Sequence, residues 1–308
     1  MASTLSSAIA AAITFKVQTD VLANLRAELV YADPAYSQQG DFDAGTDTLT
    51  FVDYPDLAVN VTAVATEGTF PASKALTMGT VNVSTSQYID SVNITDVAKV
   101  KSPHDLAQIA GERVNRQIQE SLDQISRDVI ATGGTAKFAN AITARASLTQ
   151  TTDNIDAADL RKLRANMFKG KIKPMADGFY RLLVSPEVEY DLRTETGTGG
   201  FIDAKKYDDS GALEKGEVGR MEGFKVIGVV NAPTFASTAT VHASIALGNM
   251  KGWGTGELQS LQVYHVAPGG DHSDPAAQSE LVAWKINFGV AVLKNSFYFR
   301  LETTATVL

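Results

Sequence analysis

The sequence contains no cysteine, and this absence excludes several classes of protein. Disulfide-stabilised scaffolds, thiolate metal sites and enzymes with a cysteine nucleophile all need that residue. No run of apolar residues reaches the roughly 20 that a membrane-spanning helix requires. Stability must therefore come from the burial of apolar surface in a core and from contacts between subunits.

Basic charge is also scarce, with 27 Lys and Arg against 35 Asp and Glu in 308 residues and a formal net charge of -8. No block of basic residues stands out, so we do not expect a surface dedicated to binding DNA or RNA. The content of 44% hydrophobic and 20% charged residues is typical of a globular chain that is long enough for one large core or two domains.

Candidate catalytic and metal-binding residues are few. None of the histidines has a His or Cys three or four residues away. Asp271, His272 and Asp274 are close together, but they follow two glycines, and a solvated turn explains them. Ser185 lacks the flanking glycines of a nucleophile elbow, and a role as helix N-cap explains it. The glycines between 197 and 200 do not match a phosphate-binding loop. We therefore predict no catalytic residue, no cofactor and no metal site.

The longest periodic segment covers residues 102–134 and predicts one amphipathic helix. Ser102 is a good N-cap residue, Pro103 suits the first helical position, and Gly133 with Gly134 suits the end. Apolar residues recur at steps of three or four and form one stripe. They are Leu106, Ile109, Ala110, Val114, Ile118, Leu122, Ile125 and Val129. At 1.5 Å per residue this helix is about 43 Å long, so it either lies across a sheet or forms the spine of an assembling protein.

The segments before this helix predict an arm over residues 1–47 and a long two-stranded β excursion over residues 48–96. The arm has too little apolar content to fold alone. Alternating patterns predict strands over residues 49–51, 59–64, 81–85 and 88–94, and residues 67–74 form the tip. Because two isolated strands are marginal in water, we expect both the arm and the excursion to dock on a neighbouring subunit.

After the helix, local patterns predict alternating helices and strands. Asp156 caps a helix that Gly170 ends, and Ser185 caps a shorter one. Residues 136–148 predict a helix or loop, residues 215–219 a loop, and residues 252–256 a turn or hinge. The predicted strands cover residues 180–184, 224–230, 245–248, 261–266, 281–293 and 297–302. The last two are predicted to pair with each other through a turn at residues 294–296.

This order of segments resembles that of the major capsid proteins of tailed bacteriophages, which have the Hong Kong 97-type fold. The resemblance covers nearly the whole chain, and several short strings carry it. They are Glu67-Gly68, Val184-Ser185-Pro186, Asp191-Leu192, Gly199-Gly200-Phe201, Gly216-Glu217-Val218-Gly219, Glu222-Gly223-Phe224, Asp274-Pro275 and Trp284-Lys285.

The resemblance implies an α+β fold with five parts. They are an N-terminal arm (1–47), an extended β loop with flanking strands (48–96), a peripheral domain with the spine helix (97–153), an axial domain (154–265) and return strands of the peripheral domain (266–308). The extended loop would lie over a neighbouring subunit. The implied subunit-interface residues are Glu67, Gly68, Phe70, Lys74, Gly199, Gly200 and Phe201. Some members cross-link a loop lysine to a neighbour's asparagine, but a lysine at a loop tip is usually solvated, so we do not expect that of Lys74.

The implied function is that of a structural subunit, not an enzyme, that assembles with itself into the hexamers and pentamers of an icosahedral head. Its further partners would be scaffolding, portal and decoration proteins. It would enclose double-stranded DNA without specific binding and without a membrane, in the host cytoplasm during assembly and then in the virion. The acidic net charge agrees with this, because it repels phosphate.

Three alternatives stay open from the sequence. A nanocompartment shell of the encapsulin type would have the same fold and enclose enzymes instead of DNA. A hydrolase would have its site in the α/β segment and depend on His265 or Asp271. A β-rich surface or tail adhesin would form trimeric fibres or be secreted.

Overall fold

The computed structural model of the chain describes residues 30–42, 46, 48–61, 72–102, 105–195, 217–269 and 276–306. The helices in this part are α2 (Asp96–Lys101), α3 (Leu106–Thr132), α4 (Ala157–Lys169), α5 (Pro186–Thr194), and the short 3₁₀ turns η1 (Ala139–Ala141), η2 (Arg145–Ser147) and η3 (Asn295–Phe297). The strands are β1 (Gln38–Asp41), β2 (Thr48–Asp53), β3 (Gly79–Ser84), β4 (Ser86–Thr95), β5 (Thr135–Phe138), β6 (Tyr180–Val184), β7 (Glu217–Met221), β8 (Phe224–Gly228), β9 (Thr234–Ala236), β10 (Thr240–Leu247), β11 (Trp253–Val266), β12 (Ser279–Val292) and β13 (Tyr298–Thr303).

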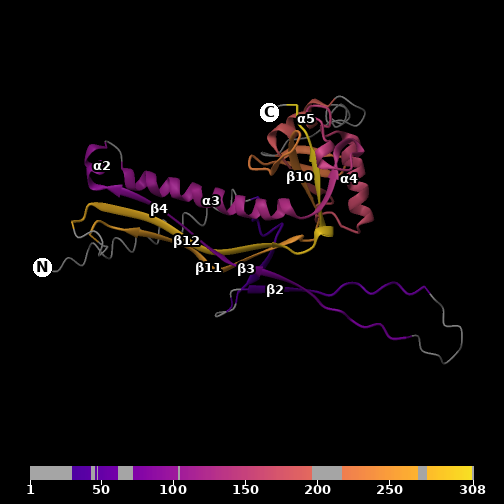
Figure 1. The fold of residues 1–308 in the computed structure, drawn as a ribbon, viewed down its shortest axis with the longest axis horizontal. Helices are drawn as coiled ribbons and strands as arrows, with labels where there is room; N and C mark the ends of the chain where they lie inside the picture. The colour runs from indigo at the N-terminus through magenta and orange to yellow at the C-terminus, as the bar shows by residue number, and fades with distance from the viewer. Residues whose placement is uncertain are drawn as a thin grey trace.

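These strands form three sheets, in the order β1-β11-β12-β4, in the order β5-β13-β10-β6-β8-β7 with β9 beside β10, and as the pair β2-β3. Figure 1 shows an elongated molecule in which α3 runs along the first sheet, with the α/β body at one end and α2 at the other. The β2–β3 pair leads away from the body as a separate excursion. The mixed α+β class predicted from the sequence is confirmed.

The long helix α3 begins three residues later than the sequence indicated. Thr95 caps the short helix α2 by accepting a hydrogen bond from the Ala98 backbone N–H, and Ser102 lies at the C-terminal end of α2. The prediction that Ser102 caps the spine helix is therefore wrong. Asp105 caps α3 instead, accepting from the backbone N–H groups of two residues in the first turn. The predicted end is confirmed, since α3 stops at Thr132 before Gly133.

The predicted apolar stripe of α3 packs on the four-stranded sheet. The two long strands β11 and β12 form an antiparallel hairpin, and β4 pairs with β12 on its other side. The buried core between helix and sheet consists of Ile94, Ala110, Val114, Ile118, Leu122, Leu261, Val263, Val282, Trp284, Ile286 and Phe288. Burial of this stripe against the sheet is the main source of stability for a helix of this length.

The predicted turn at residues 252–256 is wrong, because these residues open β11. A Cβ atom on Gly254 would lie 2.8 Å from Cε2 of Phe51, and one on Gly256 would lie 2.5 Å from Cε2 of Phe42. The glycines therefore serve the close approach of aromatic rings from the N-terminal part of the chain. They do not mark a bend in the backbone.

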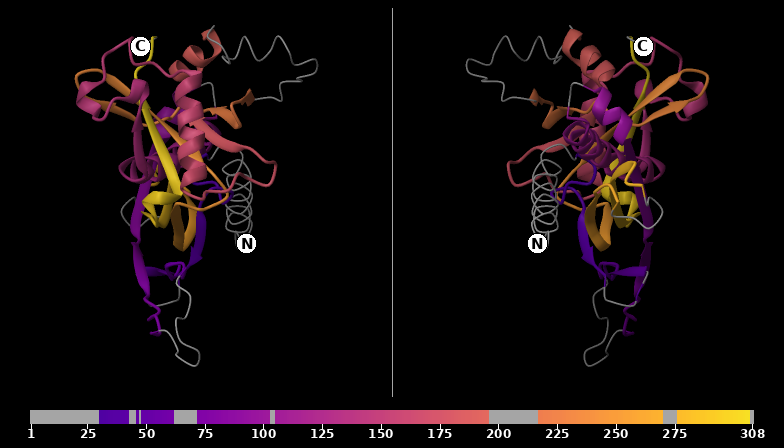
Figure 2. Two further views of the ribbon diagram at one scale, coloured as in Figure 1. Left: turned by 90° about the vertical axis from the view of Figure 1, so that its right-hand side faces the viewer. Right: turned by 90° about the vertical axis from the view of Figure 1, so that its left-hand side faces the viewer.

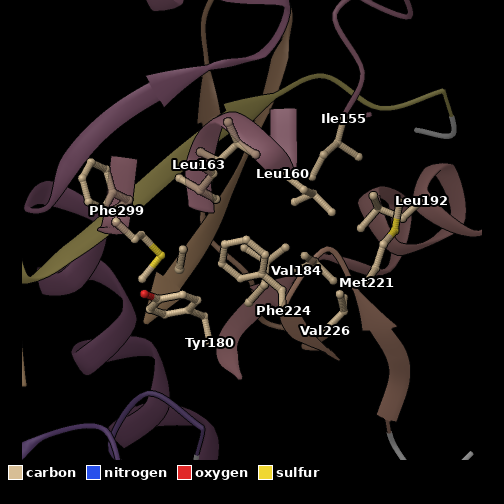
Figure 3. Close-up of a cluster of buried hydrophobic side chains, with 14 of the residues drawn as sticks. Ile155, Leu160, Leu163, Tyr180, Val184, Leu192, Met221, Phe224, Val226 and Phe299 are labelled. Atoms are coloured by element: carbon tan, nitrogen blue, oxygen red, sulfur yellow. The ribbon is translucent and has the colours of Figure 1, made fainter. Parts of the chain in front are cut away.

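The seven-stranded sheet forms the α/β body and is covered on one face by α4 and α5. Asp156 and Ser185 cap these helices as predicted. Figure 3 shows side chains of both helices meeting those of the sheet in one apolar cluster. The fully buried members include Leu160, Met167, Leu182, Val184, Val188 and Phe224. The end of α3 covers the opposite face, where Ile130 packs with Trp253 and Tyr298.

Strand β13 does not pair with β12, so the predicted terminal hairpin is wrong. After β12 the chain turns through η3, and β13 runs between β10 and β5 in the other sheet. Gly252 makes this crossing feasible, because a Cβ atom there would lie 2.3 Å from Cδ1 of Tyr298. The Tyr298 hydroxyl donates to the Ile130 carbonyl oxygen at 2.9 Å. The last strand thereby joins the spine helix to the α/β body.

A buried ion cluster reinforces this junction. Glu302 is fully buried and receives the Arg145 guanidinium in two hydrogen bonds of 2.6 and 2.7 Å. Arg300 donates to the same carboxylate at 2.8 Å, and it also donates to the carbonyl oxygen of Gly133 at 2.8 Å and to that of Ala131. The two carbonyls lie at the end of α3, where backbone acceptors have no intrahelical partner.

The described end of the arm docks on its own chain, so the prediction that it needs a neighbouring subunit is wrong for residues 30–41. Tyr31 is fully buried, and its backbone N–H donates to the Asp123 carboxylate of α3 at 2.9 Å. The Trp253 indole N–H donates to the Tyr31 carbonyl oxygen at 3.1 Å. Strand β1 then pairs in parallel with β11. Residues 1–29 lie outside the described part.

The predicted secondary structure of three further regions is corrected. Residues 59–61 carry no strand, and the rest of the predicted strand 59–64 lies outside the described residues. Residues 217–219, predicted as loop, belong to the edge strand β7. The region 136–148 contains β5 as well as the turns η1 and η2. The five-part domain division stays a prediction, while the sheets group β11 with β12 and group β5 and β13 with the α/β body.

Candidate assembly surfaces

The β2–β3 excursion is a regular ladder only at its base. The two strands pair over six residues each, and Thr50 donates across them to the Asn82 side-chain oxygen at 2.9 Å. Lys294 fixes the base to the main body through an ion pair of 2.7 Å with Asp53. Beyond the ladder, residues 54–61 and 72–78 continue without regular secondary structure. Figure 2 shows that the excursion leaves the body on the side away from α5.

The outer part of the excursion exposes an unusual amount of apolar surface. Val59 and Val61 are 82% and 90% exposed, and the neighbouring large apolar side chains are more than half exposed. These neighbours are Tyr54, Leu57, Leu76 and Met78. Covering a valine-sized side chain contributes about 1.5–3 kcal/mol. A contiguous exposed set of this kind marks an interaction surface.

Of the interface residues that the resemblance implies, only one lies in the described part of the chain. Lys74 is exposed, and its ammonium group donates to the Ala58 carbonyl oxygen at 2.5 Å, across the two sides of the excursion. Its position on the excursion agrees with the implied interface. Glu67, Gly68 and Phe70 lie outside the described residues, and so do Gly199, Gly200 and Phe201.

A second apolar surface lies at the other end of the molecule and was missed from the sequence. α2, β4 and the first turns of α3 enclose an open groove of about 370 Å³. Its apolar lining includes Val92, Ile94, Leu106, Ile109 and Ala110, with Arg113 at the edge. Ala98 of α2 also lines the groove, and its neighbours Val97 and Val100 on the same helix are 53% and 88% exposed. Their spacing of three residues is the one sequence signal that pointed to this surface.

One buried cluster in the α/β body has the residue types of a hydrolase site, but its geometry is wrong for that chemistry. His242 Nδ1 lies 3.0 Å from Ser185 Oγ and 3.7 Å from Glu187 Oε2. A catalytic triad places the serine on one ring nitrogen and the carboxylate on the other. Here both face Nδ1, while Ser185 accepts from the Val188 backbone N–H as a helix cap. Burial lowers the pKa of His242, although Glu187 opposes this.

The second histidine considered for a hydrolase is part of an ion pair. His265 Nε2 lies 2.5 Å from the buried Glu280 carboxylate, which also pairs with the Lys99 ammonium of α2. Burial and the Lys99 charge lower the pKa of His265. The cluster joins α2 to the β11–β12 hairpin and accounts for all three side chains. Asp271 lies outside the described residues, as do His272 and Asp274.

Within the described ranges, no group of three or more His, Asp or Glu residues is arranged to hold a metal ion. None of the helices in the described part is long and apolar enough to cross a membrane.

Comparison with solved structures identifies the class of protein that this architecture defines. The capsid of Ralstonia phage GP4 matches with a TM-score of 0.67 at 16% identity, over 92% of this chain and 90% of that chain. The capsid of the cyanophage P-SCSP1u matches with a TM-score of 0.64 at 18% identity, over 88% and 87%. The acid-stable capsid of the Helicobacter pylori bacteriophage KHP30 gives 0.63 at 13% identity, over 88% and 89%. The fold is therefore that of Hong Kong 97-type phage capsid proteins.

The family follows from the sequence itself. The family described as phage capsid protein matches residues 77–299, which is more than half of the chain. The chain thus belongs to the phage capsid protein family. No curated protein matches the sequence significantly. The match supports the predicted capsid function and gives no support to the nanocompartment shell or the hydrolase.

Proposed function

We propose that this protein is the major capsid protein of a tailed bacteriophage and that its subunits associate head to tail in an icosahedral head around double-stranded DNA. The observation that carries the assembly mode is the pair of exposed apolar surfaces, the excursion and the α2–α3 groove. Figure 1 shows the excursion and α2, which borders the groove, at opposite ends of the long axis, so one subunit cannot bring its own two surfaces together.

A contact between two different surfaces repeats from subunit to subunit and closes into a ring when the rotation permits. The excursion of one subunit would lie in the groove of the next. The 54–61 side of the excursion carries Asp56 and its 72–78 side carries Lys74, whereas Arg113 lines the groove and Lys101 ends α2. Apolar burial supplies the affinity, and these charges favour one orientation of the excursion.

In this proposal the protein has a structural role and no catalytic activity. Hexamers and pentamers form the shell, and scaffolding, portal and decoration proteins are further partners. Assembly takes place in the host cytoplasm, and the product is the virion. The spine helix with β4, β11 and β12 forms the peripheral domain, and the sheet from β5 to β7 forms the axial domain.

The absence of cysteine permits a direct test of the head-to-tail contact. The double variant Val59→Cys with Val100→Cys places one thiol on the excursion and one on α2, the helix that borders the groove. Treatment of assembled particles with a short bifunctional maleimide should give a ladder of covalent oligomers. The matched control pairs Val59→Cys with Val230→Cys, because Val230 is 93% exposed on the α/β body. A ladder of equal intensity in the control, or shells without a ladder in the test variant, would contradict this contact.

A second test measures what the excursion contributes to assembly. The variant Val59→Ser with Val61→Ser should fold normally, since both side chains are exposed, and should lower the yield of shells at least tenfold. Sedimentation velocity separates shells from free subunits. The single variant Val230→Ser is the control and should leave the yield unchanged. Normal shell yield from the double variant would show that the excursion does not carry the contact.

A further inference from the structure

One surface of the α/β body has the opposite charge to the chain as a whole. Residues 161–173 contain six basic residues and no acidic residue, in a chain with a net charge of -8. The first three have partners: Arg161 pairs with the Glu222 carboxylate, Arg164 donates to the Glu222 carbonyl oxygen, and Lys162 pairs with Asp159. The other three lie in residues 169–173, which we call the lysine loop. They are Lys169, Lys171 and Lys173.

The lysine loop presents unpaired charge. All three lysines are exposed. Within the part of the chain that the structure describes, none of their ammonium groups forms an ion pair. The next acidic residue along the chain, Asp177, is already paired with Arg181 at 2.7 Å. The described part of the chain therefore does not neutralise the basic field of the loop.

The backbone of the loop is firmly held. The Ile172 side chain is buried in the apolar cluster of the α/β body, and its backbone carbonyl oxygen accepts a hydrogen bond from the Tyr180 hydroxyl at 2.8 Å. The Lys173 carbonyl oxygen accepts from the Asn249 backbone N–H at 2.8 Å. A Cβ atom on Gly248 would lie 2.4 Å from Cγ2 of Ile172, which shows how closely the loop packs. Because the Ile172 side chain packs inward, the backbone that carries Lys171 and Lys173 is already fixed. A ligand that binds these lysines therefore does not pay the entropy cost of ordering the backbone.

We propose that the lysine loop binds the phosphate backbone of the double-stranded DNA that the shell encloses. This inference rests on the proposed function, which brings DNA to the protein. Lysine is a compact point charge and a sequence-independent phosphate ligand. Lysine is depleted in protein–protein interfaces, where arginine and aromatic residues are enriched. The three charges therefore favour DNA over an acidic segment of a second subunit. The rest of the chain carries a net negative charge, which repels the DNA phosphates. In this proposal the contact is therefore confined to the lysine loop.

Binding of purified, unassembled protein to an immobilised DNA duplex tests the proposal at salt concentrations from 50 to 200 mM. Each phosphate contact contributes about 0.9 to the slope of log affinity against log salt. The triple variant Lys169→Gln, Lys171→Gln, Lys173→Gln should lower that slope by about 2.7 and weaken binding at the lowest salt at least tenfold. Its side chains are exposed, and an unchanged circular dichroism spectrum checks the fold.

The matched control removes the same charge at the other end of the molecule, with Lys101→Gln, Arg113→Gln and Arg116→Gln. It should change the slope by less than 1. An equal loss in both triple variants, no change in the test variant, or no binding by the unaltered protein would overturn the proposal. A lysine-loop variant that binds DNA normally but no longer forms shells would identify a subunit contact instead.

The formation of shells by the unaltered protein is measured separately, by sedimentation. If the unaltered protein forms shells and the triple lysine-loop variant binds DNA as well as the unaltered protein does, this inference is refuted and the proposed function stands. Loop-dependent DNA binding by a protein that never assembles would refute the proposed function alone.

Discussion

Removal of the Glu302 negative charge should destabilise the subunit more than any other single carboxylate substitution at the junction between spine helix and α/β body. In the variant Glu302→Gln, two guanidinium groups stay beside a buried neutral amide. Arg300 and Arg145 also face the same Phe235 ring, with their Cζ atoms 5.5 and 3.7 Å from its centre. Hydrogen bonding to Glu302 raises the pKa of Arg145 further above its usual value in the unaltered protein, and the variant loses this interaction.

The magnitude follows from the burial of the three side chains. Breaking a buried ion pair by removing one partner costs about 3–5 kcal/mol. Arg145 keeps 33% of its side-chain surface exposed and regains water, whereas the Arg300 side chain is only 10% exposed. We therefore expect a loss near the lower end, about 3 kcal/mol in the free energy of unfolding. Because the m-value of small proteins in urea is about 1–3 kcal/mol per M, the unfolding midpoint should fall by 1 M or more.

Urea unfolding of the unassembled subunit, followed by tryptophan fluorescence, measures this loss. Glu120→Gln is the control, because Glu120 is exposed and lies 4.0 Å from Arg116. Its effect should stay within about 0.5 kcal/mol. A loss below 1 kcal/mol for Glu302→Gln would refute the view that this cluster joins the spine helix to the last strand.

Two further predictions concern the arm and the response to acid. The variant Asp123→Ala removes the acceptor of the Tyr31 backbone N–H. Because a hydrogen bond to a charged group contributes about 1.5–3 kcal/mol, we expect amide hydrogen exchange at Tyr31 to accelerate more than tenfold. Unchanged protection would show that β1 alone holds the arm. Burial lowers the pKa of both His242 and His265 in the folded state, so the unfolded state binds protons more readily and stability should decrease as the pH falls below about 6.5. His242→Gln should remove part of this pH dependence and leave the part due to His265, and equal slopes in the variant and the unaltered subunit would contradict this assignment.

The features that the sequence revealed are those that short stretches determine. Asp156 and Ser185 were recognisable as helix caps because a cap bonds to a backbone group two or three residues away. The apolar stripe of α3 is likewise visible in any window of the helix. The start of α3 was misplaced because Ser102 and Asp105 are both competent caps, and only the break between α2 and α3, with Ser102 at the end of α2, decides between them.

The features that were missed depend on residues far apart in the chain. The glycines of β11 resembled a turn because the aromatic rings that need their space come from β2 and the arm, some 200 residues earlier. The partner of β13 was wrong because strand pairing at long range leaves no local pattern. The arm docks on its own chain because the Asp123 carboxylate of α3 accepts hydrogen bonds from the backbone of Val30 and Tyr31. In the sequence, Asp123 looks the same as a carboxylate that is exposed to solvent on a helix face.

The candidate assembly surfaces divide in the same way. The base of the excursion was predicted at residues 49–51 and 81–85, because alternating strands are local patterns, but residues 59–61 carry no strand and β4 pairs with β12 in the four-stranded sheet. The groove at α2 was not predicted, since it exists only where three elements meet. The lysine loop escaped notice because it directly follows other basic residues of α4, two of which, Arg161 and Lys162, are paired with carboxylates in the folded protein.

Electron microscopy of the purified full-length protein, together with its mass by light scattering, tests the central claim of self-assembly most directly. We expect closed shells, or rings of five or six subunits, when the protein is concentrated or supplied with the phage's own scaffolding proteins. A stable monomer that still fails to assemble with those proteins present would contradict the account of this chain as a capsid subunit.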